Sequence, residues 1–280
     1  MPKIPKHVED RLVDQVKRFQ PILLAAKSRD VNEADTVLIL TDILADAFGY
    51  DKYTDLTSEM AIRGTYCDLA LKLDGKIQVL IEAKAVGMGL KDSHVKQAVD
   101  YAANKGIEWV VLTNGVVWRI YKVTFTKPID HELLCDFDFL ALNPKDEQHL
   151  QLLFLLTKEG WAKSAVGDFH QQKQALNRFF VGATLLSEPI LSVIRRELKR
   201  ISPDVRIEVE QIRTVLTDEV LKREILEGEK FTEAQKTIGR AANKALRARK
   251  DEETSEVGPP SPDRPPDAPS STSPPSAQSG

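Results

Sequence analysis

Acidic and basic side chains gather at one end of a predicted β-hairpin. Aliphatic runs on either side of Asp74-Gly75, a dipeptide typical of tight hairpin turns, predict two strands over residues 66–84. Asp68 lies near the start of the first strand, and Glu82 and Lys84 close the second. Since side chains two positions apart on a strand point to the same face, the carboxylate of Glu82 and the ammonium of Lys84 converge.

The register of the hairpin decides whether Asp68 joins them. A two-residue turn at Asp74-Gly75, without any irregularity, puts Asp68 and Glu82 on opposite faces of the hairpin. A three-residue turn closed by Gly75 in the left-handed conformation puts both on one face. Glycine suits that conformation because it has no Cβ. We therefore expect a turn of odd length, or a bulge near Gly75.

Two carboxylates beside a lysine suit the hydrolysis of phosphodiester bonds. Mg²⁺ takes oxygen ligands and keeps several waters, so one or two carboxylates plus phosphate oxygens hold it. The cation lowers the pKa of a bound water, and a nearby ammonium can position that water or stabilise charge on the phosphate. The alternative is that these are solvent-facing charges at a strand end, so other parts of the chain must agree.

A helical pattern upstream of the hairpin carries a third acid. Residues 32–48 repeat apolar side chains at helical spacing, with Glu33 on the core-facing stripe and Gly49 at the end. We expect the Glu33 carboxylate to lie close to Asp68 and Glu82. The alternative is a first-turn glutamate that is stabilised by the helix dipole.

A second helical pattern follows the hairpin. Asp92 or Ser93 can cap this helix, and Gln97 and Tyr101 share one face because they are four residues apart. Both side chains can reach the charged end of the hairpin. The alternative is an ordinary amphipathic helix that packs through its apolar residues, Val95, Ala98 and Ala102.

The order of these residues resembles the PD-(D/E)XK nuclease superfamily and, more narrowly, the N-terminal nuclease domain of type I restriction endonuclease R subunits. The similar stretches, within roughly residues 28–140, are Asn32-Glu33-Ala34, Ile81-Glu82-Ala83-Lys84, Leu112-Thr113-Asn114-Gly115 and Trp118-Arg119-Ile120-Tyr121. Cys67 departs from the pattern, since it stands where the superfamily name has proline. The resemblance implies an α/β (α+β) fold: a restriction-endonuclease-like mixed sheet flanked by helices, followed by a helical region.

The resemblance also implies a metal-dependent deoxyribonuclease of restriction, defence or repair. Asp68 and Glu82 would bind Mg²⁺ or Mn²⁺ with Glu33 as an additional metal-shell carboxylate, and Lys84 would orient water or stabilise the transition state. Gln97 and Tyr101 would shape the site or contact the DNA backbone. The alternative is a non-catalytic nucleic-acid-binding or assembly protein that retains the nuclease fold, and RNA stays open as a substrate.

Composition narrows the class of protein. The chain has 280 residues, 42% of them hydrophobic and 29% charged, which is ordinary for one or two globular domains. No G-x-x-x-x-G-K-[ST] segment occurs, so we expect no translocase motor. Two cysteines make a disulfide framework or a zinc site improbable. Without an apolar signal core or a long apolar run, we expect a cytoplasmic protein that does not bind membranes.

Three segments follow from the patterns. We expect a nuclease-like domain over residues 1–143, a helical region over 144–250 that could mediate homodimerisation or bind a protein partner, and a disordered acidic Pro/Ser-rich tail over 251–280. Helical periodicity covers residues 146–160, 169–186, 189–201 and 205–228. Two basic clusters could contact phosphates or simply face solvent: Arg195, Arg196, Lys199 and Arg200, and the cations of residues 231–250.

Overall fold

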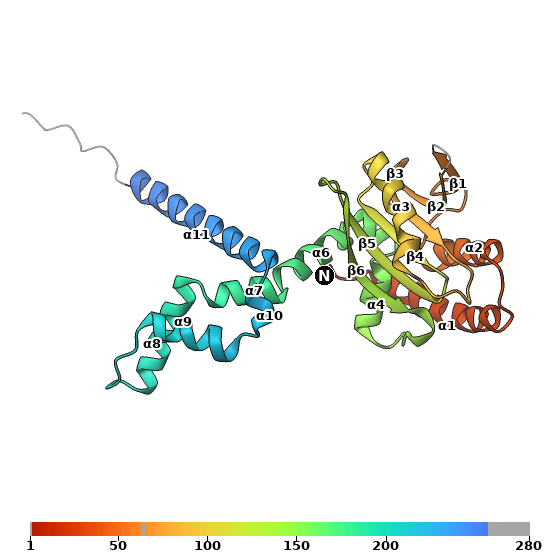
Figure 1. Ribbon diagram of the computed structural model, residues 1–280. Coiled ribbons are helices and arrows are strands. Elements are labelled where there is room, and N and C mark those ends of the chain that lie inside the picture. The colour runs from red at the N-terminus through yellow and green to blue at the C-terminus, as the bar shows by residue number, and fades with distance from the viewer. Residues whose placement is uncertain (1, 63–64, 257–280) are drawn as a thin grey trace, which may run out of the picture. The chain divides into compact units, whose positions relative to one another are not determined.

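The computed structural model describes residues 2–62 and 65–256 and divides into two compact units, residues 1–175 and 176–280 (Figure 1). The first unit holds a six-stranded sheet with flanking helices, and the second is entirely helical over the residues described. Within those residues, no helix combines the length and the apolar character that a bilayer span requires. The expected fold class, a mixed sheet flanked by helices with a helical region behind it, is confirmed.

The sheet is built in chain order from neighbouring strands, with one parallel step (Figure 1). The strands β1 to β3 are antiparallel, and so are β4 to β6. The helix α3 (Asp92–Lys105) crosses over between β3 and β4, which pair in parallel. The strand bounds are β1 Leu56–Ile62, β2 Thr65–Leu73, β3 Lys76–Ala83, β4 Trp109–Thr113, β5 Val117–Thr124 and β6 Asp130–Asp138.

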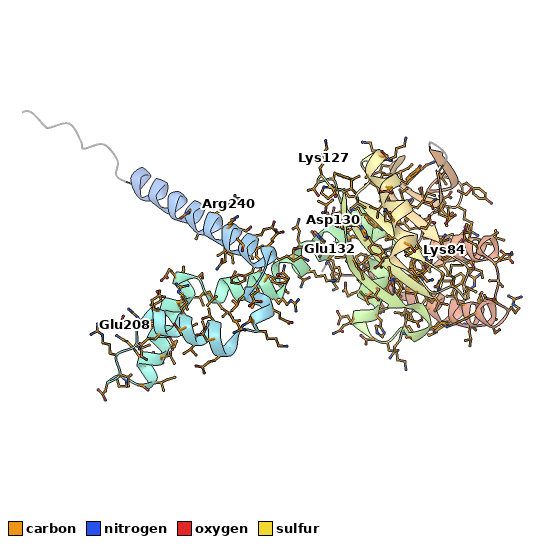
Figure 2. The ribbon with its side chains drawn as sticks, viewed as in Figure 1. Lys84, Lys127, Asp130, Glu132, Glu208 and Arg240 are labelled. Atoms are coloured by element: carbon orange, nitrogen blue, oxygen red, sulfur yellow. The ribbon has the colours of Figure 1, made fainter. Side chains whose placement is uncertain are left out.

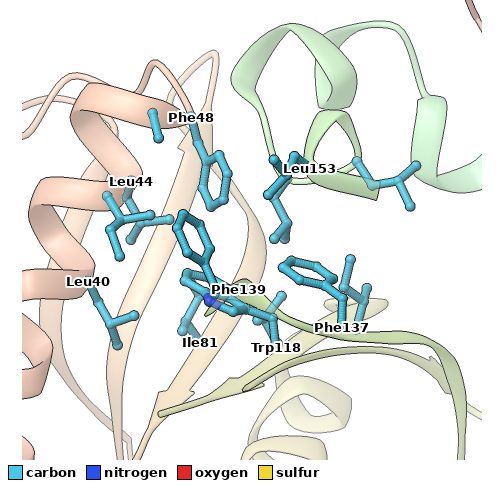
Figure 3. Close-up of a cluster of buried hydrophobic side chains, with 14 of the residues drawn as sticks. Leu40, Leu44, Phe48, Ile81, Trp118, Phe137, Phe139 and Leu153 are labelled. Carbon is cyan, nitrogen blue, oxygen red and sulfur yellow. The ribbon is translucent and has the colours of Figure 1, made fainter. Parts of the chain in front are cut away.

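Helices cover both faces of this sheet. On one face, α1 (Lys6–Ser28), α2 (Glu33–Asp42) and the π-helical turn η1 (Ile43–Ala47) bury a large apolar cluster that also takes in η2 (Phe139–Ala141) and α4 (Glu147–Phe154). Figure 3 shows part of this cluster, where Phe48 packs edge-on against Trp118. On the other face, α3 buries a smaller apolar cluster through side chains such as Val95 and Ala102. The central strands are therefore buried on both sides and hold their ends rigidly.

The hairpin of β2 and β3 has a two-residue turn followed by a bulge. Asp74 and Gly75 both have positive φ, 50° and 75°, as a type I′ turn requires. The turn pairs Leu73 with Lys76, so of the two expected alternatives the odd-length turn is wrong and the bulge near Gly75 is confirmed. Gln78 is then an extra residue on β3, because Lys72 pairs with Ile77 whereas Leu71 pairs with Val79. This one-residue shift supplies the register that a longer turn would have given.

The first unit continues past residue 143, where the sequence placed the end of the nuclease-like segment. Three short helices, α4, α5 (Lys158–Ala162) and α6 (Ala165–Ala175), belong to it. The expected single helix over residues 146–160 is wrong, because α4 ends at Phe154 and Thr157 caps α5 by accepting a hydrogen bond from the backbone N–H of Gly160. The expected helix over residues 169–186 is likewise divided between α6 and α7.

The second unit packs short helices around a small apolar core. Phe231 and Ala234 of α11 are buried against Ala183 and Leu186 near α7. The helix bounds are α7 Arg178–Leu185, α8 Glu188–Ile201, α9 Val209–Val215, η3 Leu216–Val220, α10 Arg223–Leu226 and α11 Glu229–Glu256. The continuous helix expected over residues 205–228 is wrong, since the backbone is extended at Leu221 and Lys222.

The helix α11 continues to Glu256, past residue 251, where the sequence placed the start of the tail. The rest of that expectation, residues 257–280, lies outside the described residues.

Candidate active site

Asp68, Glu82 and Lys84 come together at the end of β3. The pairing of Leu69 with Ile81, continued by one residue, brings Asp68 opposite Glu82 at the strand ends. The backbone N–H of Ala83 donates a hydrogen bond of 2.7 Å to Asp68 Oδ2, which ties the two strand ends together. Lys84 leaves β3 on the same side and bonds Glu82. The bulge at Gln78 therefore makes this arrangement possible, because without it Asp68 would point to the opposite face.

Glu82 is a buried carboxylate that is only half satisfied. Its side chain is 6% exposed, and Oε1 accepts a hydrogen bond of 2.9 Å from Lys84 Nζ. The other oxygen, Oε2, is buried and has no hydrogen-bond partner among the described residues. Burial raises the pKa of Glu82, with the carboxylates of Asp68 and Glu33 adding to the effect and the Lys84 hydrogen bond opposing it. A buried carboxylate oxygen of this kind is a potential ligand for a cation.

Lys84 links two carboxylates from different elements. Its Nζ lies 2.9 Å from Glu82 Oε1 and 3.3 Å from Glu33 Oε2, and it also donates a hydrogen bond of 2.6 Å to the carbonyl of Ala83. Burial lowers the pKa of Lys84, but the hydrogen bond and charge of Glu82 together with the other acids raise it overall. Lys84 is therefore a charged, well-held ammonium at the strand end (Figure 2).

Glu33 reaches the site from the first turn of α2. Asn32 caps this helix by accepting a hydrogen bond from the backbone N–H of Asp35, and the apolar stripe behind Glu33 is buried at Leu40. Its side chain is 45% exposed and contacts Lys84. No group of three or more His, Cys, Asp or Glu side chains within the described residues lies close enough to hold a metal ion. The expected three-acid cluster is therefore not formed, because the ammonium of Lys84 bonds both Glu33 and Glu82.

Gln97 and Tyr101 are both on α3, but they differ in burial. Gln97 is exposed, whereas Tyr101 is buried and its hydroxyl has no hydrogen-bond partner among the described residues. Burial raises the pKa of Tyr101, and Cys67 adds to the shift. The expected cap is wrong: Lys91 precedes the helix, and neither Asp92 nor Ser93 caps it.

Cys67 occupies the position where the superfamily name has proline. Its thiol is buried and donates to the carbonyl of Ile81 at 3.2 Å, across the hairpin. Burial raises the pKa of Cys67 to about 12, and the charges of Glu82 and Asp68 add to this. Because the thiolate is the reactive form, this cysteine is inert at neutral pH and acts as a packing residue.

The side chains that hold the loop after Lys84 were not predicted from the sequence. The amide nitrogen of Asn114 donates to the carbonyls of Val86 and Met88, at 3.3 and 2.8 Å. Its amide oxygen accepts from the turn that begins β5. Arg119 donates to the carbonyl of Leu90 at 3.2 Å. Asn114-Gly115 signals a turn in the sequence, but nothing in the sequence says which loop the asparagine amide would reach.

The donor set suits a hard divalent cation. Asp68 and Glu82 offer only carboxylate oxygens, and Mg²⁺ binds to one or two carboxylates while keeping waters or phosphate oxygens as its other ligands. The orphaned Oε2 of Glu82 is the atom that a cation would satisfy. Two acids therefore fit such a cation even though the described residues form no complete protein cage.

The comparison with protein families places this site inside a matched segment. Residues 40–134 match the family described as "Type I restriction enzyme R protein N terminus (HSDR_N)", which covers the hairpin and α3 but not Glu33. No curated protein and no solved structure matches the chain. The match confirms the resemblance expected from the sequence: over about a third of its length, the chain is similar to the nuclease-like N-terminal domain of type I restriction enzyme R subunits.

Proposed function

We propose that the protein is a metal-dependent deoxyribonuclease that hydrolyses DNA phosphodiester bonds in restriction, defence or repair. The observation that carries this proposal is the buried, half-satisfied carboxylate of Glu82 opposite Asp68 and beside Lys84. These residues lie in the segment that matches the restriction-enzyme family. A buried carboxylate oxygen without a hydrogen-bond partner is an atom that a bound cation would satisfy.

The roles follow from the side chains. Asp68 and Glu82 would hold Mg²⁺ or Mn²⁺, and the bound cation would supply an acidified water and neutralise charge on the phosphate. Lys84 keeps its positive charge and would donate hydrogen bonds to the phosphate oxygens. Glu33 holds Lys84 from the α2 side and keeps it aimed at the strand end. Tyr101 would shape the site, and the exposed Gln97 would contact the DNA backbone.

A cleavage assay tests the proposal. Purified protein is incubated with single-stranded, duplex and flapped DNA and with RNA, in Mg²⁺, in Mn²⁺ and in EDTA. We expect cleavage of DNA that needs the metal and falls at least about 100-fold in Lys84→Met, since one stabilising donor contributes on that order. Lys145→Met is the matched control, because Lys145 is an exposed lysine in the loop before α4.

Two outcomes would overturn the proposal. If the folded protein cleaves no substrate with either metal, the non-catalytic binding function becomes the better reading. If cleavage persists in Lys84→Met and in Glu82→Gln, the activity belongs to another site or to a contaminant. Cleavage of RNA alone would keep the chemistry and correct the substrate.

A further inference from the structure

The helix α8 of the second unit has one strongly basic face. Ser192, Arg195, Arg196, Lys199 and Arg200 follow one another at steps of three and four residues or are adjacent, so they share one side of the helix. Together these five side chains line a shallow surface hollow. The face therefore presents four cations and a hydroxyl, with no apolar side chain among its lining residues.

The opposite face of α8 is fixed by packing. Leu191 is fully buried, Ile194 is half-buried, and α8 packs against α9 within the same unit. Arg213 of α9 reinforces the contact, because its guanidinium donates to the carbonyl of Leu186 at 2.8 Å and also bonds Glu188 at the start of α8. The helix cannot rotate without losing these contacts, so the cations are held outward.

The positive charge of the basic face is only partly neutralised by nearby acidic side chains. Glu197 is the one acid beside the cations on α8, and it pairs with both Arg196, at 3.6 Å, and Arg200, at 2.6 Å. Both guanidinium groups stay largely exposed, at 70% and 75%. Within the part of the chain that the structure describes, no carboxylate pairs with Arg195 or Lys199. The face therefore has a local surplus of three positive charges.

The size and chemistry of this face match a nucleic-acid backbone. Nine residues from Ser192 to Arg200 extend along about 12 Å of helix axis at 1.5 Å per residue. One strand of a DNA duplex carries a phosphate about every 3.4 Å of its axis, so three or four phosphates fall within that length. Three of the four cations are arginines, whose planar donors pair with phosphate oxygens in two-point contacts.

We propose that the basic face of α8 is a second DNA contact, which binds backbone phosphates of the substrate independently of base sequence. This inference rests on the proposed nuclease function for the choice of DNA as the ligand. A membrane surface fits less well, because interfacial binding inserts apolar side chains into the lipid, and the side chains that line this face are all polar or charged. The basic face thus tethers DNA while the carboxylates of the first unit act on it.

The test measures DNA binding as a function of salt, using the full-length chain in EDTA so that no cleavage occurs. Fluorescence anisotropy of a short labelled duplex gives the slope of log affinity against log salt concentration. The variant replaces the four cations by glutamine: Arg195→Gln, Arg196→Gln, Lys199→Gln and Arg200→Gln. Losing four phosphate contacts should flatten the slope by about 3.6. The ratio of wild-type affinity to variant affinity should therefore fall on the order of 100-fold as the salt concentration rises from 50 to 200 mM.

A control variant with the same loss of positive charge distinguishes a specific site on α8 from a general effect of net charge. Four exposed cations of the same unit, outside α8, are replaced by glutamine: Arg178, Arg206, Lys222 and Arg223. This control variant should keep most of the slope. Glu197→Gln works in the opposite direction, because removing the shared acid should tighten binding severalfold at low salt. That variant also tests the inference if the fourfold variant fails to fold.

The outcomes separate the inference from the proposed function. If the fourfold variant and its control lose slope equally, or if Glu197→Gln does not tighten binding, the inference is overturned while metal-dependent cleavage by the wild type still stands. If the fourfold variant loses binding to phosphatidylserine vesicles but keeps its DNA slope, the face binds membranes and the inference is wrong. If the wild type cleaves nothing yet its DNA binding depends on the basic face, the inference stands and the nuclease proposal fails.

Discussion

Replacing Lys84 by methionine measures how far its ammonium compensates the buried charge of Glu82. Methionine keeps an unbranched side chain of similar length and removes the group that lies 2.9 Å from Glu82 Oε1. Glu82 is 5% exposed, and its other oxygen has no partner among the described residues. Without metal, the variant therefore holds a buried charge with little compensation, which destabilises the folded state.

The size of this loss has an upper limit, because Glu82 can take up a proton instead of staying charged. Glutamate in an unfolded chain has a pKa of about 4.3, so protonation at pH 7 costs about 3.7 kcal/mol, at 1.36 kcal/mol for each pH unit. At pH 5 the same limit is about 1 kcal/mol. We expect Lys84→Met to lose about 2 to 3.7 kcal/mol at pH 7 and no more than about 1 kcal/mol at pH 5.

The direction with pH follows from the cause of the shift. Burial already raises the pKa of Glu82 and Lys84 opposes that rise, so the variant has a still higher pKa at this carboxyl. A folded state with a raised carboxyl pKa binds more protons than the unfolded chain between the two pKa values. The stability of Lys84→Met relative to wild type should therefore increase as the pH falls from 7 towards the ordinary glutamate value.

Urea unfolding in EDTA at pH 7 and pH 5 provides the assay. Tryptophan fluorescence reports the first unit alone, because the three tryptophans of the chain, Trp109, Trp118 and Trp161, all lie within it. Lys84→Met, Glu82→Gln and the double variant form a mutant cycle, with Lys145→Met as control, and we expect a coupling of at least about 1.5 kcal/mol. An equal loss at both pH values, or additive effects in the cycle, would refute the reasoning.

Four further predictions concern other residues and segments of the chain. Asp68→Asn should leave the metal-free protein as stable as wild type or more stable while abolishing cleavage, because it removes repulsion with Glu82; a loss of folding would show that the acid is structural. Burial raises the pKa of Asp55, but the hydrogen bonds from Lys158 and from the Asp51 backbone lower it overall. The charged Asp55 carboxylate therefore stabilises the folded state above the ordinary aspartate pKa, and this stabilisation is lost as the pH falls through the lower pKa of the folded state. Asp55→Asn should cost about 1 kcal/mol at pH 7. It should also make the melting temperature less sensitive to acid below about pH 4. Deleting residues 257–280 should leave cleavage unchanged. If α11 contacts phosphates, neutralising its cations Lys236, Arg240, Lys244 and Arg247 should weaken DNA binding and flatten its salt dependence. An unchanged salt slope would mean that these four side chains only face solvent.

The sequence predicted the parts of the site that local patterns control. The hairpin around Asp74-Gly75, the helix that begins after Asn32 and the apolar face of α3 all follow from residue types within a few positions of one another. Glu82 and Lys84 share a side because a strand alternates its side chains. These features needed no knowledge of the rest of the fold.

Contacts between distant segments could not be predicted in the same way. The contact of Glu33 with Lys84 depends on how α2 packs against the sheet, and the reach of Asn114 to the loop after Lys84 depends on two parallel strands. Gln97 and Tyr101 share a helical face, but the apolar cluster between α3 and the sheet buries Tyr101, whereas Gln97 stays exposed. Packing decided these outcomes, and the spacing of residues does not specify it.

The bulge at Gln78 has a consequence for the history of such proteins. Gln78 is exposed and makes none of the contacts at the site, so its own side chain can vary freely. However, β3 must keep one extra residue at this position. Deleting it would turn Asp68 away from Glu82, although both residues would remain in the chain. A relative could therefore keep every acidic and basic residue of the site and still be inactive through a single deletion. In comparing such sequences, the length of the strand between turn and carboxylate is as informative as the identity of the carboxylate.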